Sequence, residues 1–461
     1  MRLEQSAIEG VYSSMPQQPK IKSLEVTPEQ LRRAILTSAV GSALEYYDFA
    51  IFGLATALIF SHVFFATLDS NAGLLASFAT YGVGFLARPL GGLFFGSLGD
   101  RKGRKFVLLV TIAIMGASTM MVGLLPAGPA GAIGLVLLRL LQGFGAGAEQ
   151  AGASTLMAEV APVTKRGFYA ALPFVGIFAG FGIATATFSV MQYLLDQQTI
   201  LAWAWRLPFL ASIILIGVAV WIRLRLRESP TFAALEGERN VVHSPMKLVI
   251  KEARRPILAA VLMRLAEQGG STIYTTIVIA FLGSVVAPRL GLAAGDLSRV
   301  GTTAALIATL SSVITTPFFG AMSDRFGRKT IYRWGATFML LWAIPAWWMI
   351  NTGDVLWVTI AMFGGLAIGC NSMLGAQCSH FAELFGNRYR YSGVALAREL
   401  GAMLSGGIAP LLGIYLIGLS GGAFWVMGVY TGILSILTLI GVAISTETRG
   451  RDLTDLKDAI H

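Results

Sequence analysis

The stretch GSLGDRKGRK at residues 96–105 returns as GAMSDRFGRK at residues 320–329, an offset of 224 residues. A second motif, a glutamate seven residues before an arginine, repeats at the same offset as Glu159–Arg166 and Glu383–Arg390. Two independent motifs that share one offset indicate a duplicated unit, with one copy in each half of the chain.

The sequence around these repeats is too apolar for a soluble domain. Of its 461 residues, 55% are hydrophobic and 13% are charged, and its mean hydropathy is +0.68, whereas a soluble domain carries about 25% charged residues. Apolar stretches of about 20 residues match the hydrocarbon core of a bilayer. The sequence therefore predicts an all-α membrane protein with twelve transmembrane helices, at residues 34–60, 72–99, 106–125, 130–156, 168–194, 202–224, 257–284, 300–322, 331–350, 355–379, 391–417 and 423–444.

Basic residues set the expected orientation. Of the 35 Lys and Arg residues, 28 fall in the tails and loops on one side, and only Arg289 and Arg299 fall in loops on the other. Because Lys and Arg are enriched in cytoplasmic loops, we expect both termini in the cytoplasm and the protein in the cell membrane. The net charge of +10 then follows from topology, and no nucleic-acid partner is expected.

A long polar segment that contains Pro230 and Pro245 separates the sixth predicted helix from the seventh. We therefore expect two six-helix bundles with short polar ends. The predicted division is a cytoplasmic tail at 1–33, a bundle at 34–224, a cytoplasmic linker at 225–256, a bundle at 257–444 and a cytoplasmic tail at 445–461.

The repeated motifs place opposite charges at the cytoplasmic ends of the helices. We expect these charges to form a salt-bridge layer in each half that closes the cytoplasmic side in one state and breaks in another. Ordinary loop charge that fixes topology is the alternative. The predicted gate residues are Asp100, Arg101, Arg104, Glu159 and Arg166 in the first half, and Asp324, Arg325, Arg328, Glu383 and Arg390 in the second.

These motifs resemble those of the major facilitator superfamily. The glutamate–arginine spacing and Arg-Glu-Ser-Pro at 227–230 are similar to its sugar-porter and metabolite branches. More specifically, GSALEYYDF at 41–49, RPLGG at 88–92, the segment 142–149 and RYSG at 390–393 are similar to the metabolite:proton symporters. Members of that group carry shikimate, α-ketoglutarate, citrate or proline/betaine, and residues 78–85 and 204–209 look closest to the shikimate type.

The resemblance implies the major facilitator fold and import of a small organic acid, such as shikimate or a di- or tricarboxylate, together with protons by alternating access. We expect no cofactor beyond the coupling proton, no metal and a monomer in the bilayer. No catalytic constellation or nucleotide-binding loop stands out, so an enzyme or an ATP-driven pump is not expected.

Ionisable residues inside predicted helices indicate function, because each is costly in lipid unless it is paired or hydrated. Asp48 lies roughly 20 Å from the inner face and Arg139 roughly 13 Å from the outer face, at 1.5 Å per residue. An Asp48–Arg139 pair is therefore feasible, and related sugar porters place a coupling acid and an arginine at the matching positions. We expect Asp48 to carry the proton, Arg139 to control its release, and Glu45 to assist. A static ion pair is the alternative.

Two arginines of the second half lie at one predicted depth, roughly 10 Å from the cytoplasmic face. Arg264 and Arg398 could bind a substrate carboxylate through their fork of N–H donors, or could be neutralised by Glu267 and Glu399. Arg88 is expected to brace the gate. Further substrate contacts are predicted for Glu267, Gln142, Tyr47 and Gln268, with hydrogen bonding between helices as the alternative.

Specific sequence features argue against other functions. A drug/proton antiporter would carry a Gly-Pro motif in the fifth helix, which reads PFVGIFAG at 173–180, and a sugar porter would carry paired glutamines where Glu267-Gln268 stands. An osmolyte symporter of the proline/betaine type commonly has a coiled-coil tail, yet about 15 residues without heptads follow the last helix. A nutrient sensor would need an output domain, and a passive channel would not accumulate its solute.

Overall fold

The computed structural model describes residues 28–102, 104–147, 155, 157–225, 249, 251–387, 390–455 and 457–460. Within these ranges the chain is almost entirely helical and contains no strand. Short helical segments connect the long ones: α3 (Phe60–Val63), η1 (Val163–Lys165), α9 (Gln197–Thr199) and η2 (Ile200–Ala204).

The long helices form two sets of six among the described residues. The first set is α2 (Pro28–Leu58), α4 (Ser70–Lys102), α5 (Arg104–Val122), α6 (Pro129–Ala146), α8 (Arg166–Leu194) and α10 (Arg206–Arg225). The second set begins with α13 (Arg254–Thr272), which continues through η3 (Ile273–Ile277), α14 (Val278–Phe281), η4 (Leu282–Val286) and α15 (Ala287–Leu290). Its other members are α16 (Ala294–Phe326), α17 (Arg328–Asn351), α18–η5–α19 (Val355–Met362, Phe363–Cys370, Asn371–Leu384), α20–η6–α21 (Arg390–Ala402, Met403–Ile408, Ala409–Leu419) and α22 (Phe424–Ile444).

Several helices are longer than the apolar stretches that predicted them. Helix α2 begins at Pro28 and α4 extends to Lys102, because a helix can continue beyond the hydrocarbon region that hydropathy detects. Seven helical segments are long and apolar enough to cross a membrane by length and composition alone. The others include α2 and α4, which carry buried charges in their middle.

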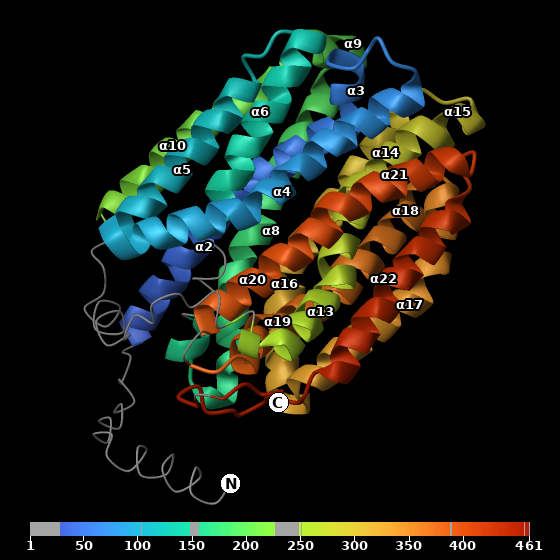
Figure 1. Ribbon diagram of the computed structural model, residues 1–461. Helices are drawn as coiled ribbons and strands as arrows, with labels where there is room; N and C mark the ends of the chain where they lie inside the picture. The colour runs from blue at the N-terminus through green and yellow to red at the C-terminus, as the bar shows by residue number, and fades with distance from the viewer. Residues whose placement is uncertain are drawn as a thin grey trace, which may run out of the picture.

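The two sets of helices lie side by side, the first drawn in blue to green and the second in yellow to red (Figure 1). The turn between α16 and α17 lies at the same end of the bundle as the C-terminal tail, and we call this end the motif end because it holds the repeated motifs. Gly327 makes that turn with φ +100°, a conformation that is open only to glycine without strain.

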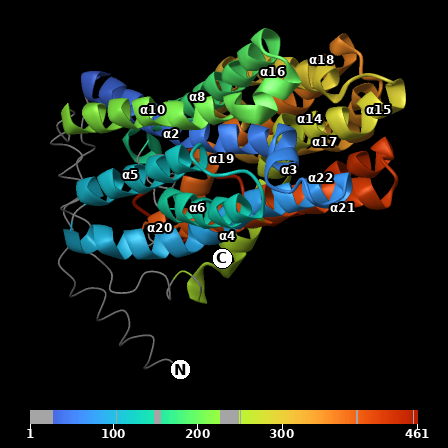
Figure 2. The same ribbon diagram turned by 90° about the horizontal axis from the view of Figure 1, so that it is seen from above.

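The halves meet along several pairs of helices, among them α8 with α19 and the three pairs described here. Helices α8 and α16 lie side by side in both ribbon views (Figures 1 and 2), and a Cβ added to Gly167 would come within 2.4 Å of the Gly320 carbonyl oxygen. On the α4–η6 contact, a Cβ added to Gly82 would lie 2.8 Å from the Gly407 carbonyl oxygen. The third contact joins α2 to η3. Glycine permits this close approach between helices in a membrane.

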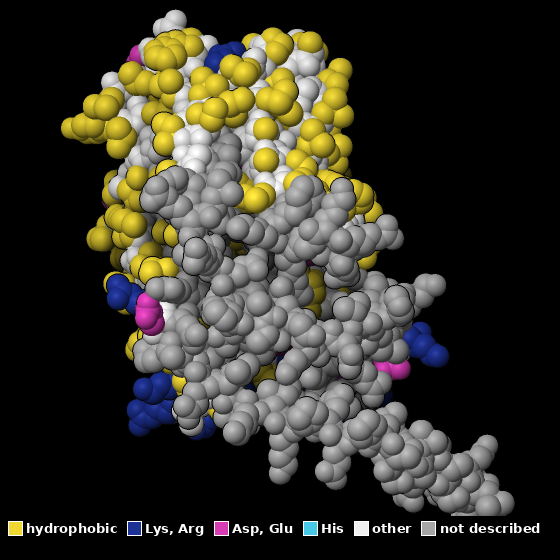
Figure 3. Space-filling model, turned by 90° about the vertical axis from the view of Figure 1, so that its left-hand side faces the viewer, with side chains coloured by type: hydrophobic (Ala, Val, Ile, Leu, Met, Phe, Trp, Pro, Cys, Tyr) yellow, Lys and Arg dark blue, Asp and Glu magenta, His cyan; other side chains and the backbone are white. Residues whose placement is uncertain are grey.

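The outside of the bundle is suited to lipid. Figure 3 shows hydrophobic side chains over most of the described upper part of one face, with the Lys and Arg side chains in view mainly toward the lower, motif end. Large apolar side chains point outward, among them Ile314 and Leu341 with 73% and 72% of their surface exposed. An apolar surface of this extent indicates a membrane environment.

The second half contains π-helical turns within three of its helices, at η3 and η4, at η5 and at η6. Such turns widen a helix locally and are frequent at functional sites. The buried ring of Tyr274 in η3 lies against Gly365 in η5, where a Cβ would come within 2.4 Å of the ring. The widened turns therefore pack against one another inside this half.

Candidate gate and substrate site

Ion pairs that cross between the halves close the motif end. Arg166 Nη1 lies 3.0 Å from Glu383 Oε1, and Arg390 Nη1 lies 3.2 Å from Glu159 Oε1. The sequence predicted pairs within each half, whereas these two pairs join each glutamate to the arginine of the opposite copy. The two copies face each other at this end, so that equivalent residues come together across the interface.

Asp324 of the second half caps α8 of the first. Its Oδ1 accepts a hydrogen bond from the Gly167 amide at 2.8 Å, and its Oδ2 accepts one from the Phe168 amide at 2.9 Å. Amides in the first turn of a helix have no partner within the helix, and the helix dipole favours an anion there. Arg328 binds Asp324 at 2.7 Å and Glu383 at 3.3 Å, which joins this cap to the ion-pair layer as expected for the second half.

Other predicted gate residues do not join this layer. The side chains of Asp100, Arg101 and Arg104 lie outside what the structure describes. Arg325 stacks on its neighbour Phe326, with 5.3 Å from Cζ to the ring centre, and makes no ion pair with any described residue. Arg325 therefore takes no part in the ion pairs described at the motif end.

The C-terminal tail also takes part in the closure, which the sequence did not predict. Arg166 Nη1 donates to the Arg451 carbonyl oxygen at 2.9 Å, so that a first-half arginine is bound by the tail. Glu447 accepts from the amides of Arg328 and Lys329 at 2.9 and 3.0 Å. The tail therefore braces both α8 and the start of α17.

A polar cluster is buried inside the first half. Arg139 is fully buried, donates to Gln142 through Nη1, and places its Cζ 4.1 Å from the centre of the Phe52 ring. Gln142 in turn donates to the Thr119 hydroxyl at 2.8 Å, and Asp48 interacts with that same threonine. Asp48 and Arg139 thus belong to one cluster, but they form no ion pair within the described residues, contrary to the expected direct contact.

Arg139 keeps one donor without a partner. Its Nη2 is buried and has no hydrogen-bond partner among the described residues. Stacking on aromatic rings stabilises a desolvated guanidinium, which accounts for its burial beside Phe52. The free donor leaves Arg139 able to bind an additional acceptor.

Glu45 belongs to a charged group that links the halves, a contact that the sequence did not predict. Arg88 Nη2 lies 3.2 Å from Glu45 Oε1, and Arg88 Nε lies 2.8 Å from Glu399 Oε2. Arg88 and Glu45 belong to the first half and Glu399 to the second. Sequence reasoning located all three inside the membrane and missed that they meet, because helix rotation and the contact between α4 and α20 are not encoded in residue depth.

A second polar network fills the second half around Gln377. Arg264 binds Glu267 at 3.0 Å, Gln377 at 2.8 Å and Gln268 at 2.8 Å. Arg398 Nη1 donates to Gln377 Oε1 at 3.3 Å. The two arginines predicted to share a level therefore do share a partner. Glu267 neutralises Arg264, whereas Glu399 turns to Arg88.

Two predicted substrate ligands are engaged within the protein in this conformation. The Tyr47 hydroxyl donates to the Pro208 carbonyl oxygen at 3.0 Å, which joins α2 to α10, and Gln142 bridges Arg139 and Thr119. In this conformation Tyr47 and Gln142 therefore form hydrogen bonds between helices, which was the alternative to substrate binding. Gln377 was not predicted, since a single glutamine in an apolar helix gives no signal of its own.

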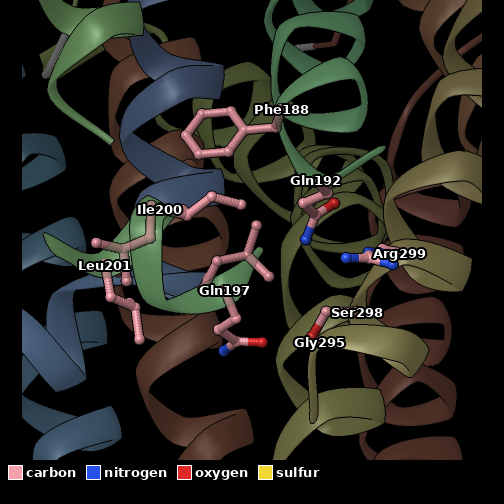
Figure 4. A pocket seen from close by; sticks show the side chains of 10 residues that line it. Phe188, Gln192, Gln197, Ile200, Leu201, Gly295, Ser298 and Arg299 are labelled. Atoms are coloured by element: carbon pink, nitrogen blue, oxygen red, sulfur yellow. The ribbon is translucent and has the colours of Figure 1, made fainter. Parts of the chain in front are cut away.

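A pocket opens between the halves at the end opposite the motif end (Figure 4). The Oε1 atom of Gln192 is buried beside it and has no partner among the described residues. The helix α9 at its edge is capped by Asp196, whose pKa is lowered because Thr199 donates hydrogen bonds to its carboxylate. The pocket is lined by Leu58, Ile59, Phe188, Gln192, Gln197, Ile200, Leu201, Gly295, Ser298 and Arg299.

No group of three His, Cys, Asp or Glu side chains close enough to hold a metal ion occurs in the part of the chain that the structure describes. The buried His380 instead contacts the hydroxyls of Thr448 and Ser445, both at 2.7 Å. This histidine is therefore part of the tail contact at the motif end.

Comparison with known proteins finds the same division of the chain into two similar halves. A family model described as sugar (and other) transporter matches residues 34–244 and again residues 238–459. The chain belongs to this family. Its members are membrane transporters rather than enzymes, and the double match reflects the repeated six-helix unit.

Curated relatives match over most of the chain. The shikimate transporter of Escherichia coli is 34% identical over 405 residues, which cover 87% of this chain and 91% of the relative. The ectoine/proline transporter ProP of Corynebacterium glutamicum is 34% identical over 410 residues, covering 85% and 79%. The inner membrane metabolite transport protein YhjE of Escherichia coli is 32% identical over 439 residues, covering 93% and 97%.

Solved structures show the fold. The proton:xylose symporter XylE, a major facilitator superfamily protein, superimposes with a TM-score of 0.70 at 16% identity and covers 92% of this chain and 98% of its own. The partially occluded inward-open form of XylE from E. coli gives a TM-score of 0.69 at 17% identity, covering 92% and 99%. The twelve-helix major facilitator fold expected from the sequence is therefore confirmed.

Proposed function

We propose that this transporter is a proton-coupled symporter that imports a small organic acid, such as shikimate or a di- or tricarboxylate, by alternating access. In this proposal the motif end faces the cytoplasm, since 28 of the 35 Lys and Arg residues fall on that side. The protein would act as a monomer in the cell membrane with no cofactor other than the proton.

The observation that carries the proposal is the set of three buried arginines where the halves face each other. Arg88, Arg264 and Arg398 are each at most 3% exposed, and Tyr46 lies within electrostatic range of all three. A guanidinium fork binds a carboxylate with two parallel hydrogen bonds. Three such groups at the interface between the moving halves favour a carboxylate as the transported group.

The named solutes of the relatives support the same chemistry. Shikimate, proline and ectoine all carry a carboxylate, although they differ in net charge and hydroxyl content. An osmolyte symporter is therefore the second candidate, favoured by the match to the ectoine/proline transporter at the same 34% identity as the shikimate transporter. Competition between labelled shikimate and unlabelled proline betaine separates the two.

We assign proton coupling to the buried cluster of Asp48 and Arg139. A carboxylate that lacks a direct cation in a dry site takes up a proton, and one that gains a guanidinium partner releases it. Asp48 forms no ion pair with another described residue in this conformation, while Arg139 keeps a donor without a described partner. A small movement of α2 against α6 would bring them together and expel the proton.

An Asp48→Asn variant tests this assignment. It is expected to exchange labelled substrate for unlabelled substrate across the membrane but not to accumulate it against a gradient, because the amide cannot release a proton. Asp354→Asn, which alters a helix cap at the opposite end, is the matched control. Accumulation by Asp48→Asn at the wild-type level would exclude Asp48 as the proton carrier.

A further inference from the structure

The charged group around Arg88 is an ionic contact between the halves that lies away from both ends of the described bundle. Arg88 donates two hydrogen bonds to Glu399, from Nε at 2.8 Å and from Nη2 at 3.4 Å. Its Nη2 also donates to Glu45 at 3.2 Å. The guanidinium also lies over the Phe49 ring at 5.1 Å. This two-donor contact is the geometry with which arginine binds a free organic carboxylate.

Arg88 retains capacity for a ligand. Its Nη1 donates to no described residue, so that two of its five N–H donors are unused. Glu399 in turn is bound by Arg88 alone, whereas Glu267 is held by both Arg264 and Gln377 at 3.0 Å each. Glu399 is therefore the acid that can leave its arginine with the least disruption of the surrounding network.

The buried charges balance before a substrate arrives. At the interface between the halves, apart from the separate Asp48–Arg139 cluster, they comprise three cations and three anions, namely Arg88, Arg264, Arg398, Glu45, Glu267 and Glu399. An additional carboxylate would add an uncompensated negative charge to a dry site, which is strongly unfavourable. A carboxylate can enter at low cost only if one of the resident acids becomes neutral.

We propose that Glu399 occupies, on the Arg88 guanidinium, the position of the substrate's carboxylate, and that it leaves as the protonated acid when the substrate binds. One proton from the outer solution, in addition to the proton assigned to Asp48, goes to the Glu399 carboxylate, and the substrate carboxylate takes over the hydrogen bonds from Nε and Nη2 of Arg88. The total charge of the layer is unchanged. This inference rests on the proposed function, since it requires a carboxylate substrate.

The exchange also loosens the contact between the halves. Glu399 belongs to α20 and Arg88 to α4, so replacement of Glu399 by a small ligand removes an inter-half ion pair only when substrate and proton are both present. The groups that surround the exchange and tune it belong to α2, α4, α13 and α20. They are Glu45 and Tyr46, Arg88, Arg264 and Glu267, and Arg398.

The test measures binding to the full-length protein in lipid nanodiscs as a function of pH. Cells that express the wild-type protein are first tested for accumulation of labelled shikimate, α-ketoglutarate, citrate and proline betaine. The compounds that they accumulate are then used as binding probes. For the wild type, Kd is expected to rise by up to about tenfold per pH unit as the pH increases, because one proton is bound with each anion. Glu399→Gln is expected to bind more tightly at neutral pH, with a pH slope smaller by about one proton.

Arg88 variants complete the test. Arg88→Gln is expected to raise Kd by about tenfold or more, and Arg88→Lys also weakens binding, because lysine lacks the fork. The controls are the exposed Glu252→Gln and Arg333→Gln, which are expected to bind as the wild type does. Tighter binding by Glu399→Gln cannot result from misfolding.

The outcomes distinguish failure of the proposed function from failure of the proposed Glu399 exchange. A wild type that accumulates none of the four probes would overturn the proposed function and this inference with it. A wild type that accumulates one of them, with Glu399→Gln keeping the full wild-type pH slope or Arg88→Gln keeping the wild-type Kd, would overturn this inference alone.

Discussion

Removal of the charge on Asp324 is expected to open the motif end. The Asp324 carboxylate accepts from the Gly167 and Phe168 amides at 2.8 and 2.9 Å, and both amides belong to the other half of the protein. Asparagine offers one acceptor oxygen and no charge, so at least one of these bonds is lost in Asp324→Asn. A hydrogen bond to a charged group contributes about 1.5–3 kcal/mol, which corresponds to a shift of about 10- to 100-fold toward the open state.

Thiol labelling measures this shift. Ala171 is fully buried where α8 meets α16, so an Ala171→Cys side chain becomes reactive only when the motif end opens. The native Cys378 is buried in the same cluster as Ala171, so the assay uses a background in which Cys370 and Cys378 are replaced by alanine. In vesicles that expose the motif end, Asp324→Asn is expected to raise the labelling rate at position 171 by about 10- to 100-fold.

Asp354 provides the matched control. It also accepts from two helix amides, those of Leu356 at 2.9 Å and Trp357 at 3.2 Å, but both belong to its own half and lie at the other end. Asp354→Asn is therefore expected to leave labelling at position 171 unchanged. Equal labelling in Asp324→Asn and the wild type, or an equal increase in Asp354→Asn, would refute the interpretation of Asp324 as an inter-half cap.

Three further perturbations address the gate and the substrate layer. Arg166→Glu is expected to abolish uptake because it places two buried carboxylates together, and the double variant with Glu383→Arg is expected to recover part of it; no recovery would contradict a direct pair. Gly167→Ala sets a Cβ 2.4 Å from the Gly320 carbonyl oxygen, so closure becomes strained by about 1–3 kcal/mol and uptake falls about 5- to 150-fold; normal uptake would exclude a tight α8–α16 contact. Arg264→Gln and Arg398→Gln are each expected to raise the KM for uptake about tenfold, and an unchanged KM in both variants would remove them from the substrate site.

The fold was predictable because its two signals are local or periodic in sequence. Apolar stretches of membrane length gave the helices, and the motifs 224 residues apart gave the duplication. The ends of α2 and α4 were not predictable to the residue, since polar turns continue the helix beyond the lipid. The π-helical turns in the second half leave no mark in hydropathy.

The site was predicted by residue more successfully than by contact. Counting residues along a helix gives depth, so it placed Asp48 with Arg139 and Arg264 with Arg398 at common levels. It does not give rotation about the helix axis, so it did not reveal that Glu45 contacts Arg88. Repeat symmetry likewise named Glu159 and Glu383 for the gate without showing that each pairs with the opposite copy.

Uptake of labelled shikimate into cells that express the protein, with and without a protonophore, tests directly whether the protein is a proton-coupled organic acid symporter. Unlabelled α-ketoglutarate, citrate and proline betaine serve as competitors in the same assay. Accumulation that the protonophore abolishes, and that the organic acids reduce more strongly than proline betaine does, is the predicted result. Shikimate accumulation that persists in the protonophore, or that proline betaine reduces more strongly than the organic acids do, would contradict a proton-coupled organic acid symporter.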